Sequence, residues 1–226
     1  MKSKKLAYII ISSFLIILSL YFVDQVLQLN YISKVLVKVI LFSIFPIIYI
    51  KLSKYNFVKD SLKVVKKKFK FKLSHLLGIL IAIILFIAFI FIEKFMNVDV
   101  LILELEEKYK INKGNIFLYG AYLIFVNSLI EEFFFRGFLF LNLKKLNMKR
   151  TAYIVSSAAF SIYHISNFQN WFNAWVLILA LVGLFLAGLI FNCLNDKDDT
   201  FLNSWFVHIC ADVSIVVIGY ILFSRV

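Results

Sequence analysis

Charged residues are scarce in this sequence: they make up 17% of its 226 residues, whereas 62% are hydrophobic. A soluble domain cannot hide that much apolar surface, so the composition argues against a soluble protein and predicts a polytopic membrane protein. Cysteine is also scarce, since Cys193 and Cys210 are the only two and form no C-x-x-C spacing. We interpret both as small hydrophobic residues that indicate neither a disulfide framework nor a metal site.

Polar linkers and internal repeats are absent, so we expect a single integrated membrane domain. The basic start MKSKK and the apolar stretch after it have no small-residue cleavage site, which predicts a retained first span rather than a signal peptide. The predicted fold is all-α, a polytopic transmembrane helical bundle with about seven spans and an interfacial basic amphipathic segment. The expected spans are residues 6–27, 35–50, 76–96, 116–143, 151–165, 172–193 and 201–223.

Acidic residues are outnumbered, 13 against 25 lysines and arginines, and the basic residues gather in short segments between apolar runs. This pattern favours the anionic surface of a membrane, and nucleic acid is not an expected partner. The positive-inside rule predicts a multi-pass protein of the cell membrane with a cytoplasmic N-terminus. The segment Lys51–Lys72 alternates apolar residues with lysine, which indicates an interfacial helix on anionic lipid. Between lipid or substrate recruitment and a loop that only fixes topology, the second interpretation is favoured.

Three charges interrupt the fourth apolar run, in the stretch NSLIEEFFFRGFLF. Each ionised side chain at the centre of a span costs roughly 2.5–3.5 kcal/mol on insertion scales, so such residues need partners or a wet cavity. Glu132 and Arg136 are four residues apart and are predicted to form an ion pair on one helix face. Glu131 is rotated by about 100° from its neighbour, so we expect it to be the free acid.

Other ionisable residues in apolar helices are candidates to meet Glu131. His164 lies in FSIYH, and His208 and Asp212 lie four apart in HICAD. Counted at about 1.5 Å per residue from the predicted cytoplasmic helix ends, the depths of these residues in the membrane overlap, which predicts convergence in one pocket. Taken singly, an intramembrane histidine is often a satisfied interhelical hydrogen-bonding group. Glu131 is the residue that a purely structural role explains least well.

Together, EEFFFR, FSIYH and HICAD resemble the motifs E-E-x-x-x-R, F-x-x-x-H and H-x-x-x-N/D, in the same order. The chain is thereby similar to the CAAX-protease and bacteriocin-processing family (CPBP, also called Abi) of intramembrane proteases. The resemblance covers residues 116–223, which would form a CAAX-protease-like catalytic helical core. Residues 1–115 would then supply N-terminal transmembrane helices and the basic cytoplasmic segment. The resemblance also implies that the protein is a hydrolase, namely an endopeptidase that cleaves a membrane-associated peptide or protein.

The resemblance also implies roles for individual residues. Glu131 would be the general base that activates water, and His164 would help to bind that water. His208 and Asp212 would stabilise the oxyanion. Asp212 departs from the Asn often found in the family, and an ionised Asp cannot donate a hydrogen bond. It would have to be protonated, or else orient His208 as the donor.

The ion pair of Glu132 and Arg136 would hold the fourth helix or contact substrate. Zinc remains an alternative, because the carboxylates and imidazoles of the four catalytic candidates could supply mixed nitrogen and oxygen ligands. No H-E-x-x-H turn is present, and a metal-free glutamate mechanism is slightly favoured.

Two other classes of protein fit parts of the pattern. One is a non-enzymatic bacteriocin immunity or membrane binding protein, which need not retain Glu131. The other is a proton-coupled transporter, disfavoured because inverted repeats and broken helix pairs are not apparent. Prenylated CAAX proteins, bacteriocin leaders and signalling-peptide precursors are all substrates that the resemblance allows. The Lys- and Ile-rich composition resembles that of a low-GC bacterium, which disfavours the first of them.

Overall fold

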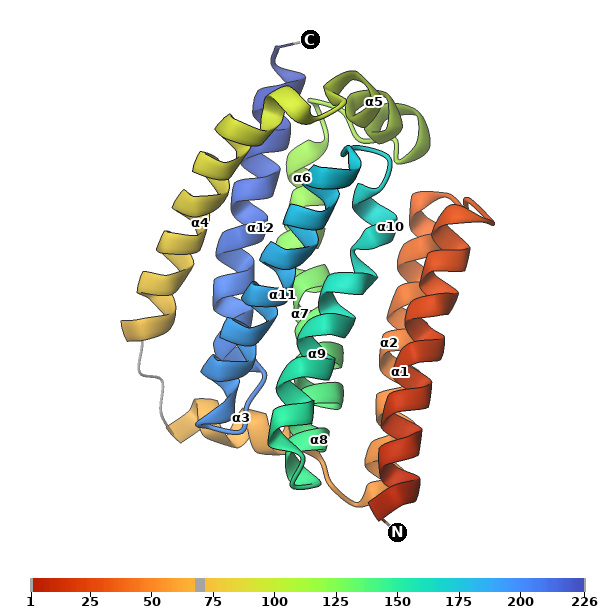
Figure 1. Ribbon diagram of the computed structural model, residues 1–226, viewed down its shortest axis with the longest axis vertical. Helices are drawn as coiled ribbons and strands as arrows, with labels where there is room; N and C mark the ends of the chain where they lie inside the picture. Colours follow the sequence, from red (N-terminus) through yellow and green to blue (C-terminus); the bar gives the residue numbers. More distant parts are fainter. Residues whose placement is uncertain (1, 68–71, 226) are drawn as a thin grey trace.

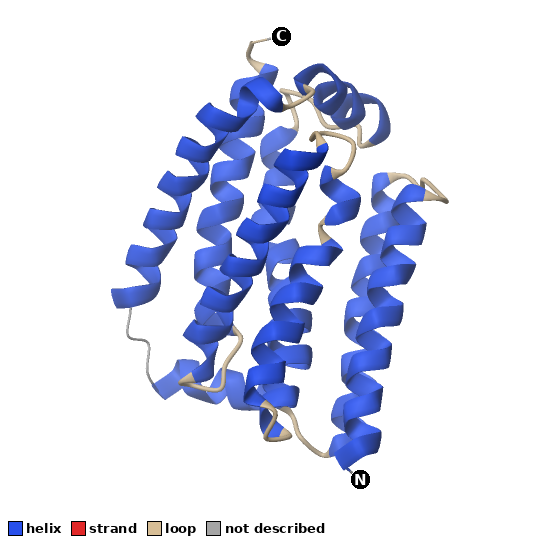
Figure 2. Cartoon of the chain, in the orientation of Figure 1, coloured by secondary structure: helices blue, strands red, loops and turns tan. Residues whose placement is uncertain are grey.

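The computed structural model describes residues 2–67 and 72–225, and over these ranges the chain consists of helices and loops (Figures 1 and 2). The predicted all-α bundle is confirmed, since the described residues contain no strand beyond an isolated β-bridge between Met96 and Phe172. The long helices run side by side, and short ones cover both ends. In chain order the elements are α1 (Lys2–Gln25), α2 (Tyr31–Ser53), α3 (Phe57–Lys67), α4 (Lys72–Ile92), η1 (Glu93–Phe95), α5 (Val98–Leu103), η2 (Glu104–Lys108), α6 (Ile116–Ala121), η3 (Tyr122–Asn127), α7 (Ser128–Glu131), η4 (Glu132–Leu141), α8 (Asn142–Lys145), α9 (Lys149–Tyr163), α10 (Ile165–Phe168), α11 (Ala174–Asp196) and α12 (Leu202–Phe223).

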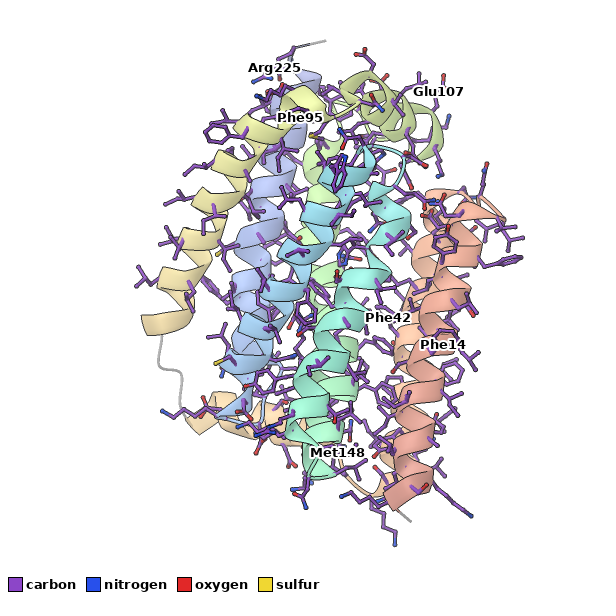
Figure 3. All side chains as sticks on the ribbon, in the orientation of Figure 1. Phe14, Phe42, Phe95, Glu107, Met148 and Arg225 are labelled. Atoms are coloured by element: carbon purple, nitrogen blue, oxygen red, sulfur yellow. The ribbon has the colours of Figure 1, made fainter. Side chains whose placement is uncertain are left out.

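The bundle turns apolar side chains outward as well as inward. In the described ranges, five helices are long and apolar enough to cross a membrane: α1, α2, Leu76–Phe95, α11 and α12. Phe14 on α1 is 65% exposed, whereas Phe42 on α2 is completely buried (Figure 3). A bilayer rather than water can cover such an outer face, so the chain is a multi-pass membrane protein.

The predicted fourth and fifth spans are less regular helices than the other five. The fourth is one continuous helical run from α6 to α8, in which η3 and η4 have π-helical hydrogen bonding. The fifth, α9, has 15 residues, and a turn at His164 separates it from α10. Irregular helical turns of this kind are frequent at functional sites, and both of these helices carry predicted site residues.

The two chain ends lie at opposite ends of the bundle (Figure 1). Helix α3 lies across the end that carries the N-terminus and packs against η4 (Figure 1). The same end carries the three basic segments of the described chain, residues 2–5, 51–67 and 144–150 (Figure 1). Phe57 and Ser61 of α3 are buried, as expected for an interfacial helix. Within the predicted lipid-binding stretch Lys51–Lys72, residues 68–71 lie outside the described part of the chain.

Small residues allow the C-terminal helices to pack closely. A Cβ added to Gly188 of α11 would lie 2.9 Å from the Cα of Ser157 on α9. Helix α4 packs along α12, where the same addition at Gly78 would lie 2.8 Å from the Sγ of Cys210. The helix with the paired glutamates packs against α9, α2 and α12. That arrangement brings the three motif-bearing helices into contact.

Candidate functional site

Glu131 lies inside the bundle and is almost completely buried. Its Oε1 atom accepts a hydrogen bond from the Lys38 ammonium at 2.6 Å and from the Asn127 amide at 3.0 Å. The expectation that Glu131 is a free acid is therefore wrong, because an ion pair with α2 offsets the cost of burying its charge. No described residue hydrogen-bonds its other oxygen, Oε2.

Two imidazoles face this Oε2 atom, one from the end of α9 and one from α12. The Nε2 atom of His164 lies 3.9 Å away, and the Nε2 atom of His208 lies 3.8 Å away. Both separations exceed a direct hydrogen bond, so a contact between these atoms would need a water between them. Three helices thus direct one carboxylate oxygen and two ring nitrogens toward a common point.

The hydrogen bonds of the two rings on their far sides assign their tautomers. The Nδ1 atom of His164 lies 2.7 Å from the carbonyl oxygen of Phe160, which can only accept, so this nitrogen carries the proton. The Nδ1 atom of His208 lies 2.9 Å from Oε1 of Glu132, a carboxylate in an ion pair, so it also donates. In their neutral forms, both rings therefore present an Nε2 lone pair to Glu131.

The predicted ion pair of Glu132 and Arg136 is confirmed, with 3.1 Å between Oε1 and Nη1 and both side chains completely buried. The Arg136 guanidinium lies between aromatic faces, 4.1 Å from the ring centre of Phe160 and 4.8 Å from that of Phe191. Glu132 also accepts a hydrogen bond from the hydroxyl of Ser204. Glu132 thus links the arginine of its own helix to α12.

Asp212 is on the same face of α12 as His208, with 3.8 Å between its Oδ1 atom and Nε2 of the ring. Its Oδ2 atom is buried and has no hydrogen-bond partner among the described residues, and the hydroxyl of Tyr122 is in the same situation. Buried polar groups without partners are uncommon and indicate a site for a substrate or water. The six residues named from the sequence thus lie together; their catalytic roles stay predictions.

Lys38 is the charged site residue that the sequence pattern did not identify, and Asn127 is a polar one. Lys38 lies on α2, in an apolar run where it is the one charge between Lys34 and Lys51. A buried charge at such a place is the signal that could have identified it, by the same cost argument applied to the glutamates. Its partner could not have been identified this way, because Glu131 is 93 residues further along the chain.

The arrangement does not fit a zinc site. Tetrahedral zinc ligands at 2.0–2.1 Å from the metal lie roughly 3.4 Å apart. Here the imidazole nitrogens lie 3.8–3.9 Å from the carboxylate oxygens that face them, and the Lys38 ammonium already holds the Glu131 carboxylate. In the described part of the chain, no three His, Cys, Asp or Glu side chains are arranged to hold a metal.

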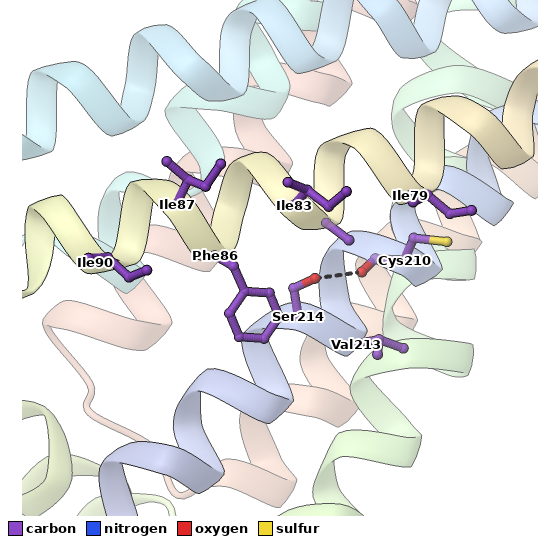
Figure 4. Close-up of a pocket in the computed structure, with 9 residues that line it drawn as sticks. Ile79, Ile83, Phe86, Ile87, Ile90, Cys210, Val213 and Ser214 are labelled. Carbon is purple, nitrogen blue, oxygen red and sulfur yellow. Dashed lines mark hydrogen bonds between the residues drawn. The ribbon is translucent and has the colours of Figure 1, made fainter.

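Two apolar cavities lie outside this cluster. One of about 560 Å³ lies between α4 and α12, lined by residues such as Ile83, Phe86 and Val213 (Figure 4). The other, of about 500 Å³, is bordered by α2, α3 and α12, and Leu129 and Ile130 from the helix of Glu131 also line it. Neither cavity includes a histidine, lysine, arginine, aspartate or glutamate among its lining residues.

Comparison with known families agrees with the three motifs. Residues 113–214 match the model of a family described as Rce1-like, type II CAAX prenyl endopeptidase Rce1-like. This segment is of the CAAX-protease family. The CAAX-protease segment contains all the motif residues and excludes Lys38. The match supports a CAAX-type intramembrane endopeptidase, a peptide hydrolase acting on membrane-associated substrates. No curated protein and no solved structure matches the chain significantly.

Proposed function

We propose that this protein is an intramembrane endopeptidase that cleaves a membrane-associated peptide or protein with water activated by Glu131. The observation that carries the proposal is the position of Oε2, which lies within 3.9 Å of the Nε2 atoms of both His164 and His208. A water bridging these three atoms can lose its proton to the carboxylate and direct its oxygen at a bound peptide.

The reaction then has two stages. The water oxygen attacks the scissile carbonyl carbon while its proton passes to Oε2 of Glu131, which leaves a tetrahedral oxyanion. The carbon–nitrogen bond then breaks, and the departing amine takes the proton from Glu131. His164 binds the attacking water through Nε2, and its far nitrogen is held by the Phe160 carbonyl. Protons and electrons balance without a further reactant.

His208 is the proposed oxyanion donor. Because its Nδ1 proton is directed at Glu132, its Nε2 atom can donate only when the ring is an imidazolium. The carboxylates of Glu132 and Asp212 flank that ring and would balance its positive charge. In this assignment Asp212 acts on the orientation and charge of His208, and it need not itself donate to the oxyanion.

The membrane placement is also part of the proposal. The three basic segments at one end of the bundle would face the cytoplasm of the cell, and α3 would lie on anionic lipid there. Glu131 is about 14 residues from the α8 end of its helix, or roughly 21 Å at 1.5 Å per residue. Cleavage would therefore occur within the bilayer rather than at its surface.

The test compares the peptide termini in membranes from cells that produce the wild type, Glu131→Gln, His164→Ala or the control Glu107→Gln. Glu107 is an exposed glutamate at the other end of the bundle from α3 (Figure 3). We expect a set of new termini in the wild type and the control that both site variants lack. Identical termini in all four samples, at equal protein levels, would refute the protease assignment.

A further inference from the structure

Lys38 comes from a part of the chain that the family match does not cover. It lies on α2, whereas the matched segment begins at residue 113. Its side chain is only 10% exposed, and its ammonium lies 5.0 Å from the ring centre of Tyr163 and 5.6 Å from that of Phe42. An ammonium placed this deep in a membrane bundle is costly and indicates a role in function.

The hydrogen bonds of Lys38 involve only one of the two oxygens of the Glu131 carboxylate. Its ammonium donates to Oε1 and to the side-chain oxygen of Asn127, and the Asn127 amide donates to the same Oε1 atom. These three side chains form a closed triangle of hydrogen bonds. The Oε1 atom therefore has two donors, whereas no described residue donates to Oε2.

This asymmetry distinguishes the two oxygens of the base. A carboxylate that is free to turn about its terminal bond can direct either oxygen at the substrate, since that torsion is broad. Two donors on Oε1 restrict the torsion, and the orientation that remains directs Oε2 at the two imidazoles. Catalytic geometry of this kind depends on side chains whose rotamers are held by surrounding hydrogen bonds.

We infer that Lys38 is a positioning residue for the reaction, which holds Oε1 of Glu131 so that Oε2 is the oxygen that takes the proton from water. The inference rests on the proposed function. It assigns to the N-terminal helices a direct part in the site, beyond holding the CAAX-protease segment in the membrane. Asn127 acts with Lys38, because it is hydrogen-bonded to both members of the pair.

A simpler role for Lys38 would be to stabilise the folded bundle by pairing a buried charge, with no effect on the reaction itself. The two roles differ in the step that a substitution affects. Loss of orientation slows the chemical step and leaves substrate binding unchanged, so kcat falls while KM is retained. A general loss of stability lowers the amount of folded enzyme but leaves the properties of the remaining enzyme unaltered.

Lys34 provides a matched control on the same helix. It forms an ion pair with Asp24 near the opposite end of the bundle from α3, and the two side chains are 13% and 11% exposed. Lys34→Met therefore removes a lysine of similar burial and charge from α2 without touching the site. We expect this variant to keep the kcat of the wild type.

The experiment uses the full chain in detergent micelles and a fluorescence-quenched peptide that spans the most strongly Glu131-dependent cleavage site found by terminus labelling. For Lys38→Met we expect kcat to fall by about 100-fold, the loss typical of a misplaced catalytic group, with little change in KM. Lys38→Arg should recover part of the loss, because it keeps a charged donor of different shape. Asn127→Ala should show a smaller fall in kcat than Lys38→Met.

Chemical rescue gives a second readout. Added ethylammonium should restore cleavage by Lys38→Ala with saturation, and a neutral alcohol of equal size should not, because only the cation donates a charge-assisted hydrogen bond.

A kcat of Lys38→Met within about threefold of the wild type would overturn the inference. So would an equal fall in kcat for Lys34→Met. If Glu131→Gln still cleaves, the proposed function itself fails; if Glu131→Gln is inactive and Lys38→Met is not, only the role of Lys38 fails.

Discussion

The Nδ1 atom of His208 lies 2.9 Å from Oε1 of Glu132, the same oxygen that the Arg136 guanidinium approaches at 3.1 Å. One completely buried carboxylate thus holds both a cation of its own helix and an imidazole of α12. Removing it leaves a buried arginine without its partner and a histidine without its fixed tautomer. Stability and catalysis are therefore coupled at Glu132.

We expect Glu132→Gln to lower the free energy of unfolding by about 3–5 kcal/mol, the usual cost of leaving one charge of a buried pair alone. Thermal unfolding of the purified protein in detergent measures this loss. The double variant Glu132→Gln with Arg136→Met should recover much of the stability but not cleavage, because a neutral amide can still accept from Nδ1 of His208 but no longer balances the charge of the imidazolium. Recovery of full cleavage in the double variant would contradict the role assigned to Glu132.

Substitutions of His208 can separate its two nitrogens. The amide of His208→Asn can replace Nδ1, which keeps the contact with Glu132 but removes Nε2, so we expect near-normal thermal stability and a rate about 10²–10⁴-fold lower. His208→Gln should be less stable, by about 1–3 kcal/mol, because a buried acceptor is left unsatisfied. Steady-state cleavage rates beside melting curves test both. An active His208→Asn enzyme would argue against Nε2 as the donor.

The two glycines of α11 provide a matched pair. Gly188→Ala should destabilise the protein by about 1–3 kcal/mol through overpacking, because its new Cβ would meet the Ser157 backbone at 2.9 Å. It should also slow cleavage, since displacement of α9 moves His164. Gly183→Ala meets nothing within 4 Å and should leave both stability and rate unchanged. Equal behaviour of the two variants in melting and rate measurements would show that close packing of α9 on α11 is unimportant.

Asp212→Asn should cleave more slowly than the wild type, by a smaller factor than His208→Asn. The 3.8 Å separation from His208 is too long for a hydrogen bond, so the variant loses no direct bond but removes one of the two carboxylates that flank the His208 imidazolium. The comparison is the kcat of Asp212→Asn with that of Asp212→Ala on the same peptide. A wild-type kcat in the Asn variant would mean that the negative charge of Asp212 is not required.

Chelation of metal ions should leave cleavage unchanged. The Lys38 ammonium at 2.6 Å from Glu131 would repel a divalent cation bound by the same carboxylate. The measurement is the rate after dialysis against 1,10-phenanthroline, together with the metal content of the purified protein. Release of one zinc ion per chain with parallel loss of activity, and recovery on adding zinc, would instead establish a metal enzyme.

Several features of this protein could be predicted from local sequence pattern. Long apolar runs predict membrane helices because a bilayer demands them, and the i, i+4 spacing of Glu132 and Arg136 predicts their ion pair because both belong to one helix. The shared location of Glu131, His164 and His208 was also predictable, from their overlapping depths in the membrane. Each of these inferences uses only the position of a residue along its own helix.

The partners of the site were decided by tertiary structure alone. Glu131 pairs with Lys38 across 93 residues, and Glu132 holds His208 across 76. Such contacts depend on which faces of separate helices pack together, and helical period carries no information about that. Local sequence pattern is enough to predict a helical membrane protein with a set of buried charges. Packing between helices decided which oxygen of Glu131 is held and which is left facing the two imidazoles.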